Sequence, residues 1–373
     1  MSKLDIKIAL KSYRPHDSIR RGMMELIFSG EDVYDQLLNS LGRIISKRIP
    51  TYAFPPELIN IERTLPESGY IDSVPFNSDY MGLRLSLFPL MNIDCELASL
   101  HEKYWFDVDY LDKDRERHEA EKKVEAFITA KNDSNEIIHV TTNDMLVYID
   151  GEEMNRSGNI YNREYPLLVI TLRPNERFCC SMTAVLGVGL RHSIWDSASN
   201  FWLDQETLEK DGQTIFCFQS ASRMNEIVLL KKGLAYFHER SLLYKNEIKR
   251  LYLLESAETG RFIITLRNED HTFGEVINYE IQSHPDVMQS GCKKPDHLIN
   301  EIVIDCIAFE RAKLLDAIME SIDRLVARID HIARSVEQLF PKESGEVVGE
   351  SSKTVSPKKP TKPEKKTEKK KKN

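Results

Sequence analysis

Two segments of the chain share one order of apolar and polar residues. Residues 261–266 (RFIITL) are rich in β-branched residues and predict a strand. Apolar residues then recur at helical spacing over 273–281 and predict a helix with one apolar face. Earlier in the chain, residues 24–28 (MELIF) predict a strand, and the stripe over 33–48 predicts a helix that ends before Pro50.

Prolines mark the next step in both segments. Residues 56–60 and 295–300 each begin with proline, and each leads into another apolar, strand-like stretch. The order of strand, helix, proline-marked turn and strand therefore occurs twice, which predicts a duplicated unit.

The start of the second short helix holds three informative residues. Thr272 and Glu275 have the spacing of a capping box, in which each side chain bonds to an unpaired backbone amide at the helix start. Gly274 in the first turn costs roughly 1 kcal/mol of helix propensity relative to alanine. We therefore expect another part of the chain to approach Gly274 closely, and the helix over 33–48 is the best candidate.

A long helix completes each unit. Residues 226–251 and 308–340 both carry apolar residues at helical spacing. In the second helix the spacing alternates between three and four residues, and this seam consists of Ile322, Leu325, Ile329, Ile332, Val336 and Leu339. Such a seam predicts lengthwise packing on a partner helix. The 226–251 helix is the obvious partner, and self-association of two chains is the alternative.

Short strands dominate the segment between the two parts of the first unit. The pattern predicts them at 136–141, 145–149, 167–172 and 178–190. The charged run 112–123 has helical character but no apolar face, so it predicts a solvated surface helix or a loop.

A further short helix is predicted over residues 79–87. Its apolar stripe of Tyr80, Leu83 and Leu87 would leave Arg84 on the flank, where a surface salt bridge is the simplest role.

Charge divides the chain near residue 341. Residues 341–373 hold eleven Lys and five Glu, a balance of +6, and because the net charge is −8 residues 1–340 carry −14. The acidic body argues against a nucleic-acid-binding surface there. The tail is expected to be disordered and to act as a solubility tail or localisation signal, with weak contact to nucleic acid or an acidic partner as the alternative.

Cysteine usage and hydropathy indicate an intracellular protein. The six cysteines are scattered and show neither a disulfide framework nor Cys-x-x-Cys zinc spacing. The N-terminal residues lack the apolar core of a signal peptide, and no apolar run approaches the ~18 residues of a membrane span.

No residue pattern makes a convincing active site. The sequence lacks a glycine-rich phosphate loop, a dinucleotide-binding fingerprint and a His-Glu-x-x-His metal motif. Cys179 and His192 could be the nucleophile and base of a hydrolase, but a buried structural cysteine is the commoner role. Asp270 as a helix cap and His271 as its hydrogen-bonding neighbour explain that pair without catalysis or metal binding. Trp195 is expected to be a packing or interface anchor.

These segments resemble two proteins of cellular RNA polymerases. Residues 261–306, with DHTFGEVINYEIQSHPD, resemble the small component called L in archaea and the eleventh subunit of eukaryotic polymerase II. Residues 24–90, with LLNSLGRIISKRIPTYAF and NSDYMGLRLSLFPL, are similar to the component called D in archaea, the third-largest eukaryotic subunit and the bacterial alpha N-terminal domain. RPNERF at 173–178 and GVGLRHSIWDSAS at 187–199 resemble the insert domain of that partner. The resemblance implies two heterodimer subunits joined in one chain, as in polymerases of large cytoplasmic DNA viruses.

The resemblance also implies a fold and a domain division. It implies an α+β fold with two alpha-type dimerisation units, each a sheet plus helices, related by a pseudo-twofold axis. The D-like unit is expected at 1–61 and 216–252, a mainly β insert at 62–215, the L-like unit at 253–340, and a disordered Lys-rich tail at 341–373.

The function implied by the resemblance is a noncatalytic assembly platform of DNA-directed RNA polymerase. Its expected partners are the largest and second-largest subunits and small subunits resembling the tenth and twelfth. The catalytic magnesium belongs to the largest subunit, so we expect no cofactor here and contact with nucleic acid only indirectly or through the tail. The expected location is intracellular and, if the protein is viral, the host cytoplasm and the virion. A stand-alone dimerisation or scaffold protein is the alternative. The residues expected at subunit interfaces are Asn39, Leu41, Pro50, Arg84, Leu85, Pro89, His192, Trp195, Asp270, His271, Thr272, Phe273, Gly274, Pro285, Gly291 and Pro295.

Several positions depart from the family's pattern. The usual leucine after His-Thr is Phe273, the usual asparagine after the glycine is Glu275, and the aromatic residue that usually follows the next glycine is Cys292. The Pro-His-Pro element is altered at 295–297. The D-like family often carries a cysteine cluster for zinc or iron–sulfur, but that region here contains only Cys95.

Overall fold

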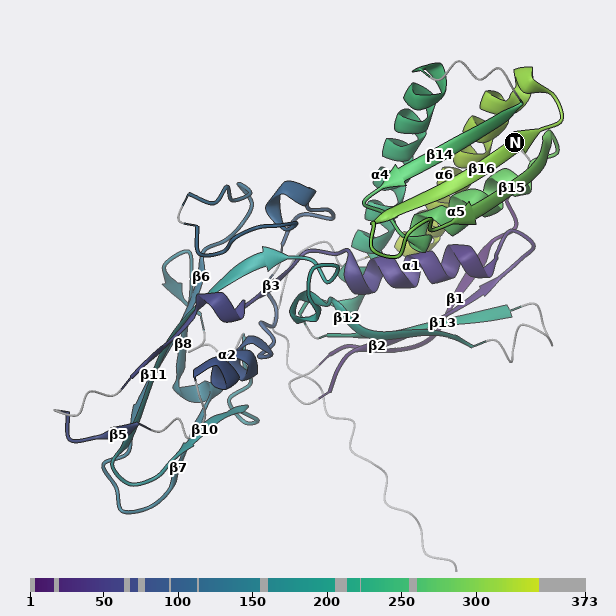
Figure 1. Cartoon of the computed structure of the whole chain (residues 1–373). Helices are drawn as coiled ribbons and strands as arrows, with labels where there is room; N and C mark the ends of the chain where they lie inside the picture. The colour runs from purple at the N-terminus through teal and green to yellow at the C-terminus, as the bar shows by residue number, and fades with distance from the viewer. Residues whose placement is uncertain are drawn as a thin grey trace, which may run out of the picture. The chain divides into compact units, whose positions relative to one another are not determined.

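A computed structural model describes residues 4–341 of the chain, except 17–19, 64–67, 73–77, 94, 113, 155–159, 205–212, 222 and 255–259. Within this range the chain is a mixed α and β protein with several antiparallel sheets (Figure 1). No helix of the described residues combines the length and apolar character needed to cross a bilayer. The Lys-rich tail beyond residue 341, for which the sequence predicts disorder, lies outside the described residues.

The first sheet joins N-terminal strands to strands from the middle of the chain. Its antiparallel order is β1-β2-β13-β12. Alternation along β2 buries Met24, Leu26 and Phe28 completely, and they share a core with α1. The bounds are β1 Lys7–Arg14, β2 Met23–Ser29, α1 Asp35–Lys47, β12 Ala198–Asp204 and β13 Gln213–Ser220.

The second sheet lies entirely in the C-terminal half. Its antiparallel order is β14-β16-β15. Phe262, Ile264 and Leu266 alternate along β14 and are buried, and α5 packs on β15 and β16. The bounds are β14 Arg261–Arg267, α5 His271–Gln282, β15 Val287–Lys293 and β16 Glu301–Ala308.

Both sheets repeat one order of elements. β2 leads into α1 and pairs with β13, which precedes α4; β14 leads into α5 and pairs with β16, which precedes α6. The predicted succession of strand and helix is therefore present twice. The predicted equivalence of the proline-marked strands is wrong, because the segment after Pro56 becomes β4 of another sheet whereas the segment after Pro295 becomes β16. Hydrophobicity alone does not specify which strand a segment pairs with.

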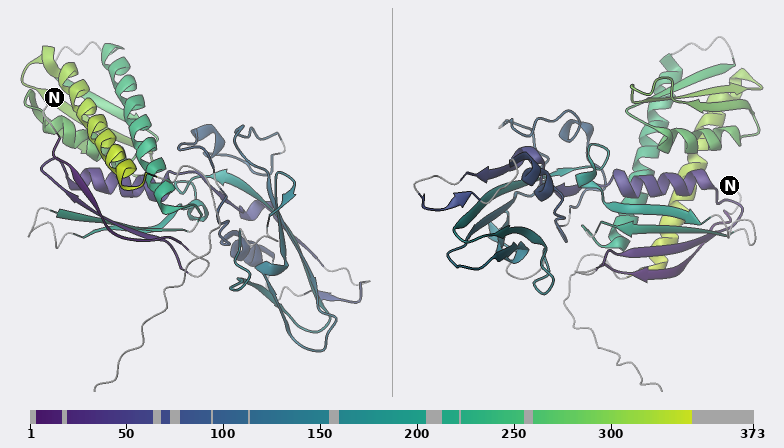
Figure 2. Two further views of the ribbon diagram at one scale, coloured as in Figure 1. Left: turned by 180° about the vertical axis from the view of Figure 1, so that it is seen from behind. Right: turned by 60° about the horizontal axis from the view of Figure 1, so that its bottom comes forward.

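Two long helices pack against each other and against both sheets. They are α4, Glu226–Leu254, and α6, Leu314–Leu339, which lie side by side (Figure 2). This confirms the packing partner predicted for the 3.5-residue seam, whose members from Ile322 to Val336 are buried. The predicted start of α6 at 308 is early, because a short 3₁₀ helix at Arg311–Lys313 comes first. One hydrophobic core includes residues of both sheets and of all four helices named so far.

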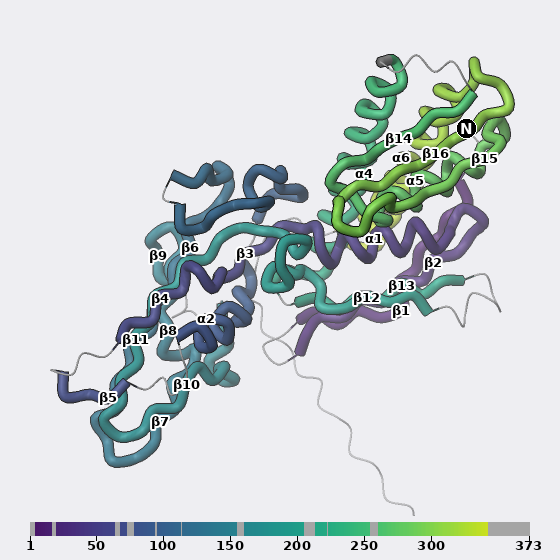
Figure 3. The backbone as a smooth tube through the Cα atoms, in the orientation of Figure 1, coloured from purple at the N-terminus to yellow at the C-terminus, as the bar shows by residue number. Residues whose placement is uncertain are grey.

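The remaining described strands form the insert (Figure 3). The insert has a hydrophobic core of its own. Its main sheet has the order β3-β11-β6-β8-β9, with β4 and β5 also paired to β11, and β10 pairs with β7. The bounds are β3 Thr51–Ala53, β4 Ile59–Glu62, β5 Ile71–Asp72, α2 Ser78–Ser86, β6 Val124–Lys131, β7 Ile138–Thr141, β8 Met145–Ile149, β9 Glu152–Glu153, β10 Leu168–Leu172 and β11 Glu176–Gly187.

The strand pairing differs from the expected bounds of the insert at both ends. β12 and the first residues of β13 lie within 62–215, the expected insert, yet both strands pair in the first sheet. β3, expected in the first unit, pairs instead with β11. The described residues of 112–123 form loop and turns without a helix, and there Arg115 and Glu121 make a buried ion pair at 3.0 Å.

Candidate functional site

The two halves of the chain meet where α1 packs on α4 and α5. Leu41 of α1 and Phe273 of α5 are both buried in the shared core. Phe273 is surrounded by three rings of α4, those of Tyr236, Phe237 and Tyr244, with centroids 6.3, 5.5 and 5.2 Å away. Aromatic pairs in these tilted and edge-on arrangements stabilise by more than their buried area alone. The predicted apolar stripes of α1 and α5 therefore face a common interior.

Two close approaches set the spacing of these helices. Ser40 Oγ donates a hydrogen bond to the Thr272 carbonyl oxygen at 2.5 Å, which ties the middle of α1 to the first turn of α5. A Cβ on Gly233 of α4 would lie 2.6 Å from Ile45 Cγ1 of α1, so a glycine is needed there for α1 to pack so closely.

Gly274 also permits a close approach, but the predicted partner is wrong. A Cβ at this position would lie 2.6 Å from Ile302 Cγ1 and 2.8 Å from Cys292 Sγ, both on the second sheet. Gly274 thus faces its own sheet and does not face α1. The apolar side of α5 covers that sheet, and Gly274 lies on this side of the helix.

A buried ion pair fastens the C-terminal end of α1 to the N-terminal end of α5. Arg48 donates two hydrogen bonds to Glu269, Nη1 to Oε1 at 2.9 Å and Nη2 to Oε2 at 2.7 Å. The Arg48 side chain is 5% exposed and that of Glu269 is 0% exposed. Tyr244 donates a further hydrogen bond to Glu269, and Asp270 lies 3.4 Å from Arg48. Such a bidentate pair is strong and directional.

A second cluster fastens the opposite ends of the same helices. Glu280, in the last turn of α5, accepts hydrogen bonds from Arg328 of α6 at 2.5 and 2.7 Å and from the Tyr34 hydroxyl at 2.6 Å. Arg328 also reaches Asp32, just before α1, at 2.7 Å. The ring of Tyr34 stacks on that of Tyr279 with centroids 4.0 Å apart. The residue before α1, the end of α5 and the middle of α6 therefore form one polar network.

The electrostatics keep Arg48 and Asp270 charged and Tyr34 protonated. Burial alone would lower the pKa of Arg48, but the charge of Glu269 raises it above its ordinary value. Burial, and then Glu280, raise the pKa of Tyr34 well above its ordinary value, so its hydroxyl stays protonated and donates. Burial acts to raise the pKa of Asp270, but Arg48 and the hydrogen bonds of Thr272 outweigh it and the pKa is lowered.

The cap of α5 differs from the predicted capping box. The N-cap is Asp270, whose Oδ1 accepts a hydrogen bond from the Thr272 amide at 2.7 Å. Glu275 does not reach back to the cap; it lies 2.9 Å from His271 Nδ1 one turn earlier. Asp270 as the cap was the alternative explanation of this sequence, and Asp is among the best capping residues.

The predicted stripe on α2 faces outward. Tyr80, Leu83 and Leu87 are 56%, 55% and 66% exposed, whereas Leu85 is fully buried. The stripe prediction is wrong because a nine-residue helix gives too few turns to fix which face is covered. Arg84 Nη2 donates to the Leu168 carbonyl oxygen at 3.1 Å, and among the described residues it makes no ion pair, contrary to the expected surface salt bridge.

The expected interface residues separate by exposure. Buried in the chain are Leu41, Pro50, Leu85, Trp195, Thr272, Phe273 and Gly274; partly exposed are Asn39, Pro89 and Asp270; exposed are Arg84, His192, His271, Pro285, Gly291 and Pro295. Trp195 anchors packing as expected, with Nε1 donating to the Val185 carbonyl oxygen at 3.1 Å.

Cys179 and His192 do not form a nucleophile and base. Cys179 is buried in β11, and Gly187 at the end of that strand lies eight residues further on, roughly 26 Å away at 3.3 Å per residue. His192 follows only five residues later and accepts a hydrogen bond from the Ile194 amide at 3.2 Å. Cys179 and His192 therefore do not meet as the hydrolase alternative requires.

Sequence reasoning missed the polar clusters of Arg48 and Glu280 at the helix ends. Arg48 ends the apolar stripe of α1, and Glu280 lies on α5 between apolar positions. A charged residue on an otherwise apolar helix face needs a buried partner, and that signal could have identified both residues.

Comparison with known proteins agrees with this arrangement. Residues 261–335 match the family model described as the RNA polymerase Rpb3/Rpb11 dimerisation domain. Residues 261–335 are therefore similar to an Rpb3/Rpb11 dimerisation domain. The matched segment begins with β14 and ends in α6, so it contains Phe273, Glu269, Glu280 and Arg328.

A viral protein is similar to this chain over most of its length. It is named "Putative DNA directed RNA polymerase subunit" and comes from Acanthamoeba polyphaga mimivirus. The identity is 21% over an alignment of 329 residues, and the alignment covers 84% of this chain and 88% of the relative. The similarity therefore extends well beyond the matched domain into the insert and the first unit.

Proposed function

We propose that this chain is a noncatalytic assembly subunit of a viral DNA-directed RNA polymerase and that it holds both halves of a dimerisation platform. The observation that carries the proposal is the contact of α1 with α5, which is fastened at both ends because Arg48 pairs with Glu269 and the Tyr34 hydroxyl donates to Glu280. The matched family domain and the viral relative support it.

We propose two dimerisation units related by a pseudo-twofold axis. The first comprises about 1–50 and 198–254, the second about 260–340, and the insert about 51–197. The repeated order of strands and helices supports this division, and so does a core shared by the two units but separate from that of the insert.

The proposed partners are the two largest polymerase subunits, together with small subunits resembling the tenth and twelfth. Tyr80 and Leu83 on the outward face of α2, with Leu87 directly after the helix, form the apolar surface that we propose for one of these contacts, because exposed apolar side chains gathered in one place are typical of interaction sites. His271, Pro285 and Pro295 are exposed on the second unit and are proposed for another.

Affinity purification of the tagged full chain from cells that produce the virus tests the proposal. We expect mass spectrometry to identify two proteins much larger than the 43.2 kDa chain in stoichiometric amounts. Recovery of the chain solely as a homodimer would overturn the assembly role and favour a stand-alone dimerisation or scaffold protein.

A further inference from the structure

Three side chains with metal-ligating atoms meet between α5 and β15. His271 and Glu275 lie one turn apart on the helix, and Cys292 lies on the neighbouring strand. One ligand atom from each lies within 4.8 Å of the other two, and His271 Nδ1 is 2.9 Å from Glu275 Oε1. We propose that His271, Glu275 and Cys292 form a binding site for a borderline-soft divalent metal ion, with zinc as the expected occupant.

The fold brings the thiol to the helix in a specific way. Gly274 sits between the two helical donors, and a Cβ on it would lie 2.8 Å from Cys292 Sγ. Only a glycine therefore lets the sulfur lie against the first turn of α5. The Asp270 cap fixes that first turn, and pairing of Cys292 with Ile304 fixes the strand. Both donor-bearing backbones are thus held independently of any ion.

The donor set selects the kind of ion. Magnesium and calcium take oxygen ligands, so a thiol and an imidazole disfavour both. Zinc accepts sulfur, nitrogen and carboxylate oxygen together, and three protein ligands leave a fourth position open for water or another group.

The site is open to solvent on one side. A hollow of about 210 Å³ lies beside it, lined by His271, Thr272 and Glu275 of α5 and by polar residues of α1 that include Asn39. The side chains of His271 and Glu275 are 45% and 41% exposed, so an ion can enter without unfolding the helix. Arg43 also lines the hollow.

A structural alternative is an ordinary surface pair of His271 with Glu275 that has no role for the thiol. Such a pair contributes little to stability and binds no metal. The two possibilities differ in whether sulfur enters the coordination sphere, which makes cobalt the suitable probe because thiolate ligation gives it a charge-transfer absorption in the near ultraviolet.

The experiment is a titration of the metal-free, reduced full chain with Co²⁺. We expect one equivalent to produce the sulfur-to-cobalt band and Zn²⁺ to remove it. Cys292→Ser should abolish the band, and His271→Ala or Glu275→Gln should weaken Co²⁺ binding at least tenfold. His297→Ala, which changes an exposed histidine outside the site, and Cys179→Ser, which changes a buried thiol of the insert, should leave the titration unchanged.

Two results would overturn the site. One is a wild-type chain that gives no sulfur-to-cobalt band, and the other is a Cys292→Ser chain that keeps it. Circular dichroism and the urea midpoint of each variant show that it is folded before titration. The site does not depend on the proposed polymerase role, since it is measured on the isolated chain, and its failure would leave the assembly proposal intact.

Discussion

The guanidinium of Arg48 and the carboxylate of Glu269 form two parallel hydrogen bonds, although 221 positions of sequence separate the residues. Arg48 is the C-cap of α1, and Glu269 lies just before α5. At the other end of both helices Glu280 pairs with Arg328 and Tyr34. Because each end of the contact carries its own buried polar attachment, α5 cannot slide along α1 without breaking one of them.

Glu269→Gln tests the first attachment. The variant removes the negative charge and leaves Arg48 buried without its main counter-ion, so the free energy of unfolding should fall by about 3 kcal/mol or more. Urea unfolding of the full chain measures the loss. The double variant Arg48→Met/Glu269→Leu should lose less than the single one, because it removes both charges and keeps the volume apolar.

The matched control is the exposed pair of Arg261 with Asp305, whose closest atoms are 2.5 Å apart. Asp305→Asn breaks a similar bidentate pair in solvent, so it should cost far less than Glu269→Gln. Equal losses in the two variants would contradict a special role for burial at Arg48.

Tyr34→Phe tests the second attachment. Its hydroxyl donates to the buried carboxylate of Glu280, and hydrogen bonds to charged groups contribute roughly 1.5–3 kcal/mol. We expect a loss of that size in urea unfolding. Tyr70→Phe removes a hydroxyl that donates to an exposed carboxylate, that of Asp133, and should have little effect. If both variants behave alike, the Glu280 network does not stabilise the contact between the two units.

Periodicity predicts the elements whose pattern is long. The seam of α6 gives five buried positions from Ile322 to Val336, and over so many turns only one helix face can be apolar. β2 and β14 alternate cleanly and are predicted equally well. In α2 the nine-residue helix allows more than one phase, so the stripe through Leu83 predicts burial at a position that is exposed.

The site is less predictable, because periodicity shows which residues share a face but not what covers that face. Gly274 indicates a close approach, yet only the structure shows that Ile302 and Cys292 approach it. Likewise, the partners of Arg48 and Glu280 lie far along the chain, where no local pattern can identify them.

Phe273→Asp and Leu83→Glu separate the internal contact from the external one. Phe273→Asp places a charge among the rings of α4, which costs several kcal/mol, so the chain itself should lose its fold and recover no large subunits. Leu83→Glu changes an exposed residue of α2, so the purified chain should unfold at the wild-type urea concentration yet recover less of the large subunits. Leu253→Glu, on an exposed position of α4, is the control. Full recovery of the large subunits with the Leu83→Glu chain would show that α2 does not contact them.

Asp270 predicts a dependence of stability on pH. Its pKa is lowered in the folded chain, so the unfolded chain binds a proton at higher pH than the folded one. The stabilisation by Asp270 is therefore complete above about pH 5 and is lost as the pH falls through the folded-state pKa, below the usual value of about 3.9. Urea unfolding between pH 7 and pH 3 should show a shallower decline for Asp270→Asn than for the wild type. Identical slopes would show that this carboxylate gains nothing from Arg48.

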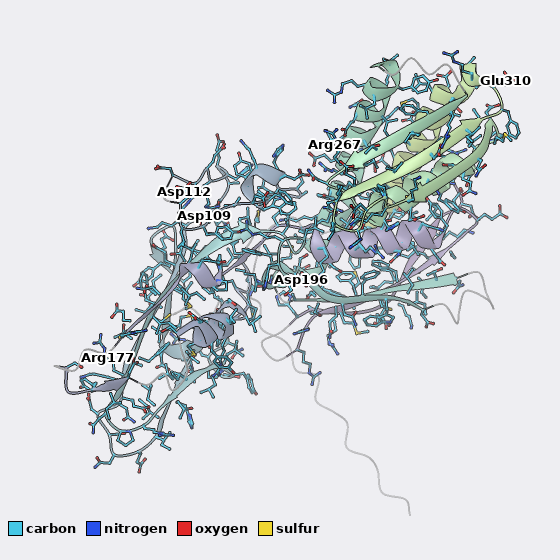
Figure 4. The ribbon with its side chains drawn as sticks, viewed as in Figure 1. Asp109, Asp112, Arg177, Asp196, Arg267 and Glu310 are labelled. Carbon is cyan, nitrogen blue, oxygen red and sulfur yellow. The ribbon has the colours of Figure 1, made fainter. Side chains whose placement is uncertain are left out.

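Arg223→Lys tests how the insert is joined to the first unit. Arg223 donates to the carbonyl oxygens of Tyr52, Ile194 and Asp196, and Figure 4 shows Asp196 beside the C-terminal end of α1. Burial lowers the pKa of Arg223 to about 10, so it stays charged at neutral pH. A lysine ammonium cannot span three separate carbonyl groups, and each one left unpaired costs about 1–3 kcal/mol.

The expected result for Arg223→Lys is a lower urea midpoint together with faster proteolysis between β11 and β12. Arg84→Lys is the matched control, since Arg84 donates to a single carbonyl oxygen at an exposed position. If the two variants lose the same stability, the hydrogen bonds of Arg223 to three carbonyl groups are not what joins the insert to the first unit. Faster cleavage of the Arg223 variant alone would show that the guanidinium holds Tyr52, at the start of the insert, together with Ile194 and Asp196, at its end. Both ends depend on the same three hydrogen bonds.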